Sequence, residues 1–95
     1  MTNIVSLEHY VKLNTRINKY GDNCNIGDII TWSMSKNKQQ LFGIIRNKHS
    51  TCLNVDLLDY KIFNNSIILT ETRKIDDICH NVLKYTRKII IINHI

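Results

Sequence analysis

Residues near the start of the chain follow a helical period. One set recurs at steps of three and four, with charged residues between its members: Leu7, Tyr10, Val11, Asn14, Ile17 and Tyr20. Ser6 is a favourable N-cap, and Gly21 supplies the left-handed residue that commonly ends a helix. The pattern therefore predicts a helix over residues 6–20.

The middle of the chain consists of short β-rich runs separated by polar turns. Strands are predicted over four ranges: 28–34, 40–46, 51–58 and 66–70. Polar turns are predicted over three: 35–39, 47–50 and 64–65. Strands spaced about every ten residues and joined by short polar turns are typical of a small antiparallel sheet or barrel.

The C-terminal part reads as a short helix followed by a strand. One helical face is marked by Ile75, Ile78, Cys79 and Val82. Asp76 and Asp77 lie where a helix N-terminus favours negative charge, so a helix is predicted from residue 75 to about 85 and a strand from 86 to 93. The expected fold is a single α+β, mainly β domain over residues 1–95: an N-terminal helix (6–20), a β-barrel (27–75), and a helix with a terminal strand (75–95).

Four consecutive isoleucines give the terminal strand an unusual surface: Ile89, Ile90, Ile91 and Ile92. Isoleucine on both faces of a strand requires burial on both faces or a partner on one. These residues are therefore predicted to form a homodimer interface. The alternative is intramolecular burial between the barrel and the N-terminal helix.

The middle segment resembles a known family. The motifs that carry the resemblance are Gly27-Asp28, Trp32, Phe42-Gly43-Ile44-Ile45, Val55 to Tyr60, Ile68 and Arg73-Lys74-Ile75. In order and spacing they are similar to a Tudor domain, a small SH3-like antiparallel β-barrel, over about residues 26–78. The resemblance implies the barrel fold and an interaction function.

Tudor domains hold a methylated lysine or arginine in a box of aromatic rings. Phe42 and Tyr60 fall on box-like positions, whereas Leu57 and Met34 stand where the family has aromatics. Lys61 would repel a cationic ligand. The cage is therefore incomplete, and the candidate ligand-binding aromatics are Trp32, Phe42 and Tyr60.

The chain carries a net charge of +5 and has a pI near 9.3. This excess of positive charge favours the binding of polyanions. Four basic residues in or near the first two hairpin turns are candidate phosphate contacts: Lys36, Lys38, Arg46 and Lys48. Together with Trp32 or Phe42 they would form a groove for a nucleic acid. The alternative is that they are solvated turn residues that protect sheet edges.

No pattern in the sequence indicates catalysis, a metal or a cofactor. The three cysteines form no CxxC pair, so neither a zinc site nor a disulfide framework is predicted, and free, mostly buried thiols are expected: Cys24, Cys52 and Cys79. The histidines lie beside no nucleophile motif: His9, His49, His80 and His94. We therefore expect neither an enzyme nor a small-molecule substrate.

The N-terminus lacks the features of a signal peptide, and the longest apolar run, Ile89 to Ile92, is too short to span a bilayer. These features predict an intracellular protein without membrane contact, cytoplasmic or nuclear or carried in a virus particle. Abundant isoleucine, asparagine and lysine point to an A/T-rich genome, such as that of a large DNA virus or its satellite.

The sequence leaves three binding functions open. The leading prediction is a non-enzymatic, homodimeric Tudor-like module that engages protein partners. The alternatives are a basic protein that contacts the phosphate backbone of DNA or RNA, and a reader of methyl-lysine or methyl-arginine peptides.

Overall fold

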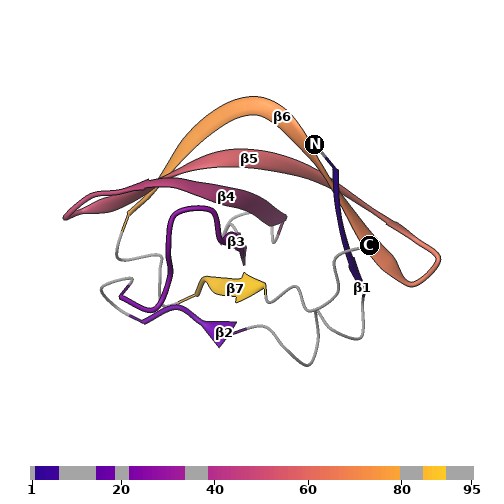
Figure 1. Ribbon diagram of the computed structural model, residues 1–95, viewed down its shortest axis with the longest axis horizontal. Helices are drawn as coiled ribbons and strands as arrows, with labels where there is room; N and C mark the ends of the chain where they lie inside the picture. The colour runs from indigo at the N-terminus through magenta and orange to yellow at the C-terminus, as the bar shows by residue number, and fades with distance from the viewer. Residues whose placement is uncertain (1, 7–14, 19–21, 34–38, 80–84, 90–95) are drawn as a thin grey trace.

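The computed structural model describes residues 2–6, 15–18, 22–33, 39–79 and 85–89, and these form one antiparallel sheet (Figure 1). Its strands are β1 (Thr2–Ser6), β2 (Thr15–Arg16), β3 (Ile29–Ser33), β4 (Gln40–Lys48), β5 (Cys52–Phe63), β6 (Ser66–Cys79) and β7 (Arg87–Ile89). The spatial order is β1-β6-β5-β4-β3-β7-β2.

The centre of the sheet is a meander in which β3, β4, β5 and β6 are successive neighbours. After β6 the chain returns so that β7 lies beside β3, and β2 pairs with the other edge of β7. At the opposite end of the order, β1 pairs with the first part of β6. Figure 1 shows β4, β5 and β6 arching over β7 and β2.

Strand β3 is buried on both faces. Its first four residues, Ile29 to Trp32, are all buried. In its pairing with β4, Thr31 lies opposite Phe42 and Trp32 opposite Leu41. Since residues directly opposite each other share a face and successive residues alternate, Trp32 and Phe42 project from opposite faces of the sheet.

Two separate apolar clusters cover these two faces. The Trp32 cluster comprises Ile17, Cys24, Ile30, Trp32, Ile45, Leu53, Val55 and Ile78. The Phe42 cluster comprises Ile29, Phe42, Leu58, Ile67, Leu69 and Ile89. Ile17 and Cys24 precede β3 in the chain, and the Ile17 amide donates to the carbonyl of Thr86 at 3.0 Å. The segment before β3 therefore covers one face of the central strands.

A bulge interrupts the long β5–β6 hairpin. The register passes from Asp56 opposite Ile75 to Leu58 opposite Glu71, so three residues of β6 stand against one of β5. Thr72 holds the bulge, because its hydroxyl donates to the Leu57 carbonyl at 2.9 Å and accepts from the Lys74 amide at 3.2 Å. Arg73, at the centre of the bulge, has a φ of 61°. Such a bulge bends a strand and increases its twist.

The predicted α+β fold is wrong for the described residues, which contain strands and no helix. Instead of a helix over 6–20, Ser6 ends β1 and residues 15–16 form β2, while 7–14 lie outside the described residues. Residues 75–79, predicted as the start of a second helix, continue β6, and 80–84 are also outside. Both errors have the same physical reason: pairing with β6, β7 or β5 satisfies the backbone of these short segments, which outweighs a weak helical period.

The central strands are confirmed in place. β3 lies within its predicted range, and β4 begins at the predicted residue but continues to Lys48, two residues into the predicted turn at 47–50. Asn64 and Asn65 form the predicted turn, with the positive φ angles of 49° and 59° that a type I′ hairpin turn requires. β5 and β6 run further than predicted. The terminal strand is confirmed over residues 87–89, and 90–93 lie outside the described residues.

We predict that Gly43→Ala destabilises the protein. A Cβ at this position would lie 3.2 Å from Cη2 of Trp32, 3.2 Å from Cβ of Val55 and 3.1 Å from the Asp56 carbonyl oxygen. Relieving such contacts in a packed core costs about 1–3 kcal/mol. Urea denaturation of Gly43→Ala beside Thr70→Ala, a change at an exposed strand position, measures the loss. Equal midpoints for the two variants would contradict close packing of Trp32 over β4.

Candidate interaction site

Two of the three candidate ligand-binding aromatics belong to the core. Trp32 is 3% exposed and Phe42 2% exposed. They lie on opposite faces of the sheet and in different clusters. The predicted groove, in which bases would stack on either ring beside the basic turns, is therefore not assembled by the described residues.

The third aromatic, Tyr60, is 44% exposed and leans on Phe42. The two ring centroids are 4.9 Å apart and the ring planes are inclined by 55°. Leu57 pairs with Gly43 and so faces the Trp32 cluster rather than these rings. Met34 lies outside the described residues. Among the described residues, this pair of rings is not extended into a cage.

The described candidate phosphate contacts are engaged within the chain. Arg46 forms an ion pair with Asp56, its Nη1 lying 3.4 Å from Oδ1. Lys48 donates from Nζ to the carbonyl of Cys24 at 2.6 Å. Lys36 and Lys38 lie outside the described residues. Two of the four predicted phosphate contacts therefore bind groups of their own chain.

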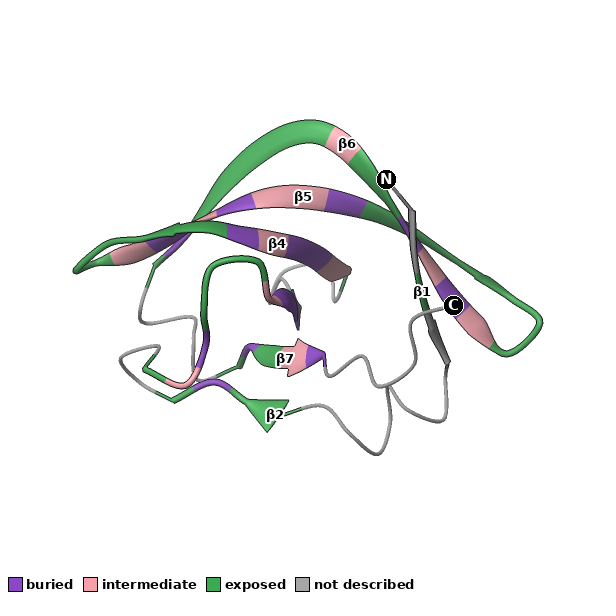
Figure 2. Ribbon diagram, in the orientation of Figure 1, coloured by how far each residue is buried: buried purple, intermediate pink, exposed green. Residues whose placement is uncertain are grey.

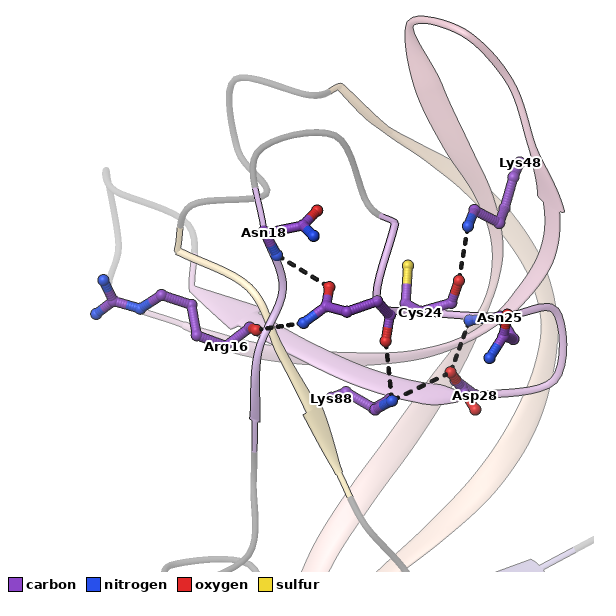
Figure 3. A network of polar contacts seen from close by, with 8 residues as sticks. Arg16, Asn18, Cys24, Asn25, Asp28, Lys48 and Lys88 are labelled. Atoms are coloured by element: carbon purple, nitrogen blue, oxygen red, sulfur yellow. Dashed lines mark hydrogen bonds and ion pairs between the residues drawn. The ribbon is translucent and has the colours of Figure 1, made fainter.

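Lys88, like Lys48, binds a backbone carbonyl of the loop that precedes β3 (Figure 3). Its Nζ donates to the Asn23 carbonyl at 2.9 Å and lies 3.9 Å from Oδ2 of Asp28. That carboxylate also accepts from the Asn25 amide at 2.7 Å. Lys48 from β4 and Lys88 from β7 thus hold two successive carbonyls of the loop that precedes β3.

Asparagine side chains fix the other side of this loop. Asn23 accepts from the Asn18 amide at 3.0 Å and donates from Nδ2 to the Arg16 carbonyl at 2.9 Å. The Asn18 side chain in turn accepts from the Asp22 amide at 2.9 Å. The loop is therefore tied to β2 as well as to β4 and β7, which places Cys24 in the Trp32 cluster.

The Cys24 thiol is fully buried. Burial raises the pKa of this thiol, and the nearby cations Lys48 and Lys88 offset only part of that effect. Because the thiolate is the nucleophilic form of cysteine, Cys24 is a core residue and not a reactive group. Of the three cysteines expected to be mostly buried, Cys52 is half-buried and Cys79 exposed.

Hydrogen-bonded polar side chains link β5 and β6 near the start of β5 and the end of β6. A ring nitrogen of His49 contacts the Asn54 side-chain oxygen, and the Asn54 amide donates to Asp77 on the neighbouring strand. Asn54 and Asp77 are register partners, so this is a cross-strand pair. No group of three or more metal-ligating side chains occurs in the part of the chain that the structure describes.

The main exposed apolar surface lies at the far end of the β5–β6 hairpin. We call residues 59–63 the β5 limb. Within it Tyr60 is 44% exposed, and Ile62 and Phe63 are each 61% exposed. Figure 2 shows this end of the hairpin as mostly exposed. Tyr60 and Ile62 project from one face of the strand and Phe63 from the other, and exposed apolar side chains of this size are of the kind that protein partners cover.

The β5 limb is also an open edge in the described sheet. β4 pairs with β5 only as far as Leu58, which lies opposite Phe42. Residues 59–63 pair with β6 on one side, and none of the described residues pairs with them on the other. An edge of this kind presents backbone donors and acceptors that a further strand can use.

The predicted dimer residues lie elsewhere. Ile89 is 5% exposed and opposite Ile29, so it belongs to the Phe42 cluster of its own chain. β7 has β3 on one edge and β2 on the other. For Ile89 the structure therefore shows the intramolecular alternative, with strands in place of the expected helix. Ile90, Ile91 and Ile92 lie outside the described residues.

Sequence reasoning missed the β5 limb because it ended the third strand at Leu58. The signal was present: Asp59, Tyr60, Lys61 and Ile62 continue the alternation of polar and apolar residues up to the turn at Asn64. What the alternation could not show is that β4 stops pairing at Leu58, which leaves the limb uncovered.

The comparisons with known proteins found no matching family model, no matching curated protein and no matching solved structure. The Tudor resemblance therefore stays a prediction. Among the described residues, no helix is long and apolar enough to cross a membrane.

We predict that burial of the Cys24 thiol makes stability fall at alkaline pH. The folded protein holds this proton more tightly than the unfolded chain, because burial raises the thiol pKa. Its contribution is complete below the unfolded pKa of about 8.5 and is lost as pH rises through the folded value. The difference in unfolding free energy between wild type and Cys24→Ala, measured from about pH 7.5 to about pH 10, should narrow with rising pH. A constant difference would show that the thiol titrates alike in both states.

Proposed function

We propose that the protein is a non-catalytic interaction module that binds a second copy of itself through the β5 limb. The observation that carries the proposal is the exposure of Tyr60, Ile62 and Phe63 on a strand edge that no described residue covers. Such a surface supports protein binding better than nucleic-acid binding, because its large exposed side chains are apolar or aromatic and the charges of Asp59 and Lys61 cancel.

An edge strand suits a two-fold symmetric dimer. In a dimer with two-fold symmetry the same patch is used on both copies and must be complementary to itself. Two identical strand edges meet this condition when they run antiparallel, since each offers the same alternation of amide donors and carbonyl acceptors. The apolar side chains of the limb would then be covered by those of the second copy.

The open edge of the limb allows one register in which all five of its residues pair. If two limbs pair antiparallel about Lys61, Asp59 of each copy lies opposite Phe63 of the other, and Tyr60 lies opposite Ile62. Pairing centred nearer to Leu58 would place Ile62 against an edge that β4 already occupies. The register about Lys61 therefore brings the apolar residues of the two limbs together, with one contact between like charges at its centre.

We predict that Ile62→Asp weakens self-association at least tenfold. A charge at this position would be buried in the dimer interface, whereas it stays hydrated in the monomer. The dimer dissociation constant can be measured by sedimentation velocity over a range of concentrations. Ile75→Asp is the matched control, because Ile75 lies on β6, outside the limb, and is also 61% exposed.

The same measurement contains the outcomes that contradict the proposal. If the wild-type protein stays monomeric at high concentration, the proposal is wrong. It is also wrong if Ile62→Asp and Ile75→Asp weaken the dimer equally. Binding to DNA or RNA with an affinity that falls steeply with salt would favour the polyanion alternative instead.

We predict that Lys61→Ala strengthens self-association. In the register centred on Lys61 the two lysines lie opposite each other, and removing this contact between like charges should stabilise the dimer by about 0.2–1 kcal/mol. Lys74→Ala is the control, because it removes one exposed lysine outside the limb. Equal dimer dissociation constants for wild type and Lys61→Ala would show that the limbs do not pair in this register.

A further inference from the structure

Two of the three cysteines lie directly opposite each other on neighbouring strands. Cys52 begins β5 and Cys79 ends β6, and the two are register partners in the antiparallel ladder. Opposed residues of such a ladder carry their side chains on the same face. The next pair on this face, Asn54 and Asp77, makes a side-chain hydrogen bond across the same two strands, so side chains here do meet.

The backbone geometry at this pair suits a disulfide. Opposed Cα atoms in antiparallel strands are about 5.5 Å apart at a hydrogen-bonded pair and about 4.5 Å apart at a non-hydrogen-bonded pair. Disulfides span Cα separations of about 4.4–6.8 Å. Either kind of pair therefore has a suitable Cα separation. The Cβ atoms of opposed residues lie about 4.5–5.5 Å apart and must approach to about 3.5–4.5 Å as the bond closes.

The two thiols are also reachable by reagents in solution. Cys79 is exposed and Cys52 is half-buried, whereas Cys24 is fully buried and belongs to the Trp32 cluster. Both are free thiols in this structure. We infer that Cys52 and Cys79 form a redox modification site that closes to an intramolecular disulfide with a small-molecule disulfide as oxidant.

The chemistry proceeds by two exchanges. The exposed Cys79 thiolate attacks one sulfur of the small-molecule disulfide, which forms a mixed disulfide and releases one thiolate of the oxidant. The Cys52 thiolate then attacks Sγ of Cys79, forms the cross-strand bond and releases the second thiolate. Two protein thiols are oxidised, and one small disulfide is reduced to two thiols, since the two thiolates released take up, through solvent, the two protons that the protein thiols lose.

Closing this bond would change the stability of the hairpin that carries the β5 limb. The loop from Cys52 to Cys79 contains all of β5, the Asn64-Asn65 turn and the β6 bulge. A cross-link over this length lowers the entropy of the unfolded chain, and the bond also fixes the register of the two strands. Oxidation would therefore make the hairpin harder to open.

The test uses the full chain, incubated with oxidised glutathione and then alkylated under native and denaturing conditions. Mass spectrometry should show a monomer that has lost the mass of two hydrogen atoms, with a cross-linked peptide containing Cys52 and Cys79. Cys24 should be the single thiol alkylated after unfolding. The melting temperature of the oxidised monomer should rise by at least about 5 °C.

Two variants separate this bond from other oxidation products. Cys52→Ser should stop at the mixed disulfide on Cys79, and neither Cys52→Ser nor Cys79→Ser should show the increase in melting temperature. A stable glutathione adduct on Cys79 of the wild type, or a disulfide between two chains, would overturn the inference. These measurements do not depend on limb pairing, because the bond forms within one chain.

Discussion

Burial of β3 and the middle of β4 on both faces is the constraint on which the rest of the sheet depends. Trp32 and Phe42 project in opposite directions from adjacent strands, and each anchors its own apolar cluster. Full burial of a large apolar side chain contributes about 1.5–3 kcal/mol, so neither face can be left uncovered. The absence of a side chain at Gly43 allows the Trp32 ring to pack against β4, since a Cβ there would contact the ring.

This two-sided core explains which elements are fixed and which remain open. The loop before β3 covers one face through Ile17 and Cys24, and two lysines hold it in place. Strand β5 continues past Leu58, where its pairing with β4 ends, and β6 beside it still carries Ile67 and Leu69 into the Phe42 cluster. At this end of the hairpin the core is therefore covered on the β6 side, whereas Ile62 and Phe63 of β5 stay exposed.

Three of the thirteen lysines and arginines have a structural role that the total charge of the chain does not show. Lys48 and Lys88 donate to loop carbonyls, and Arg46 pairs with Asp56. A net charge counts cations without their partners, so a value of +5 cannot distinguish a phosphate-binding surface from lysines that hold a loop. The aromatic residues pose the same problem, because Trp32 and Phe42 are equally prominent in the sequence whether they bind a ligand or fill the core.

The sequence by itself determined the position of the central strands and of the asparagine turn, because alternation and turn chemistry are local properties. Tertiary structure decided the rest. Residues 75–79 joined β6 because β5 offered a pairing edge, and the isoleucine-rich end placed Ile89 in the core through β3. The open limb at Tyr60 and the opposition of Cys52 and Cys79 depend on where one strand stops beside another. Strand register and strand ends are set by contacts between distant segments, and no local pattern records them.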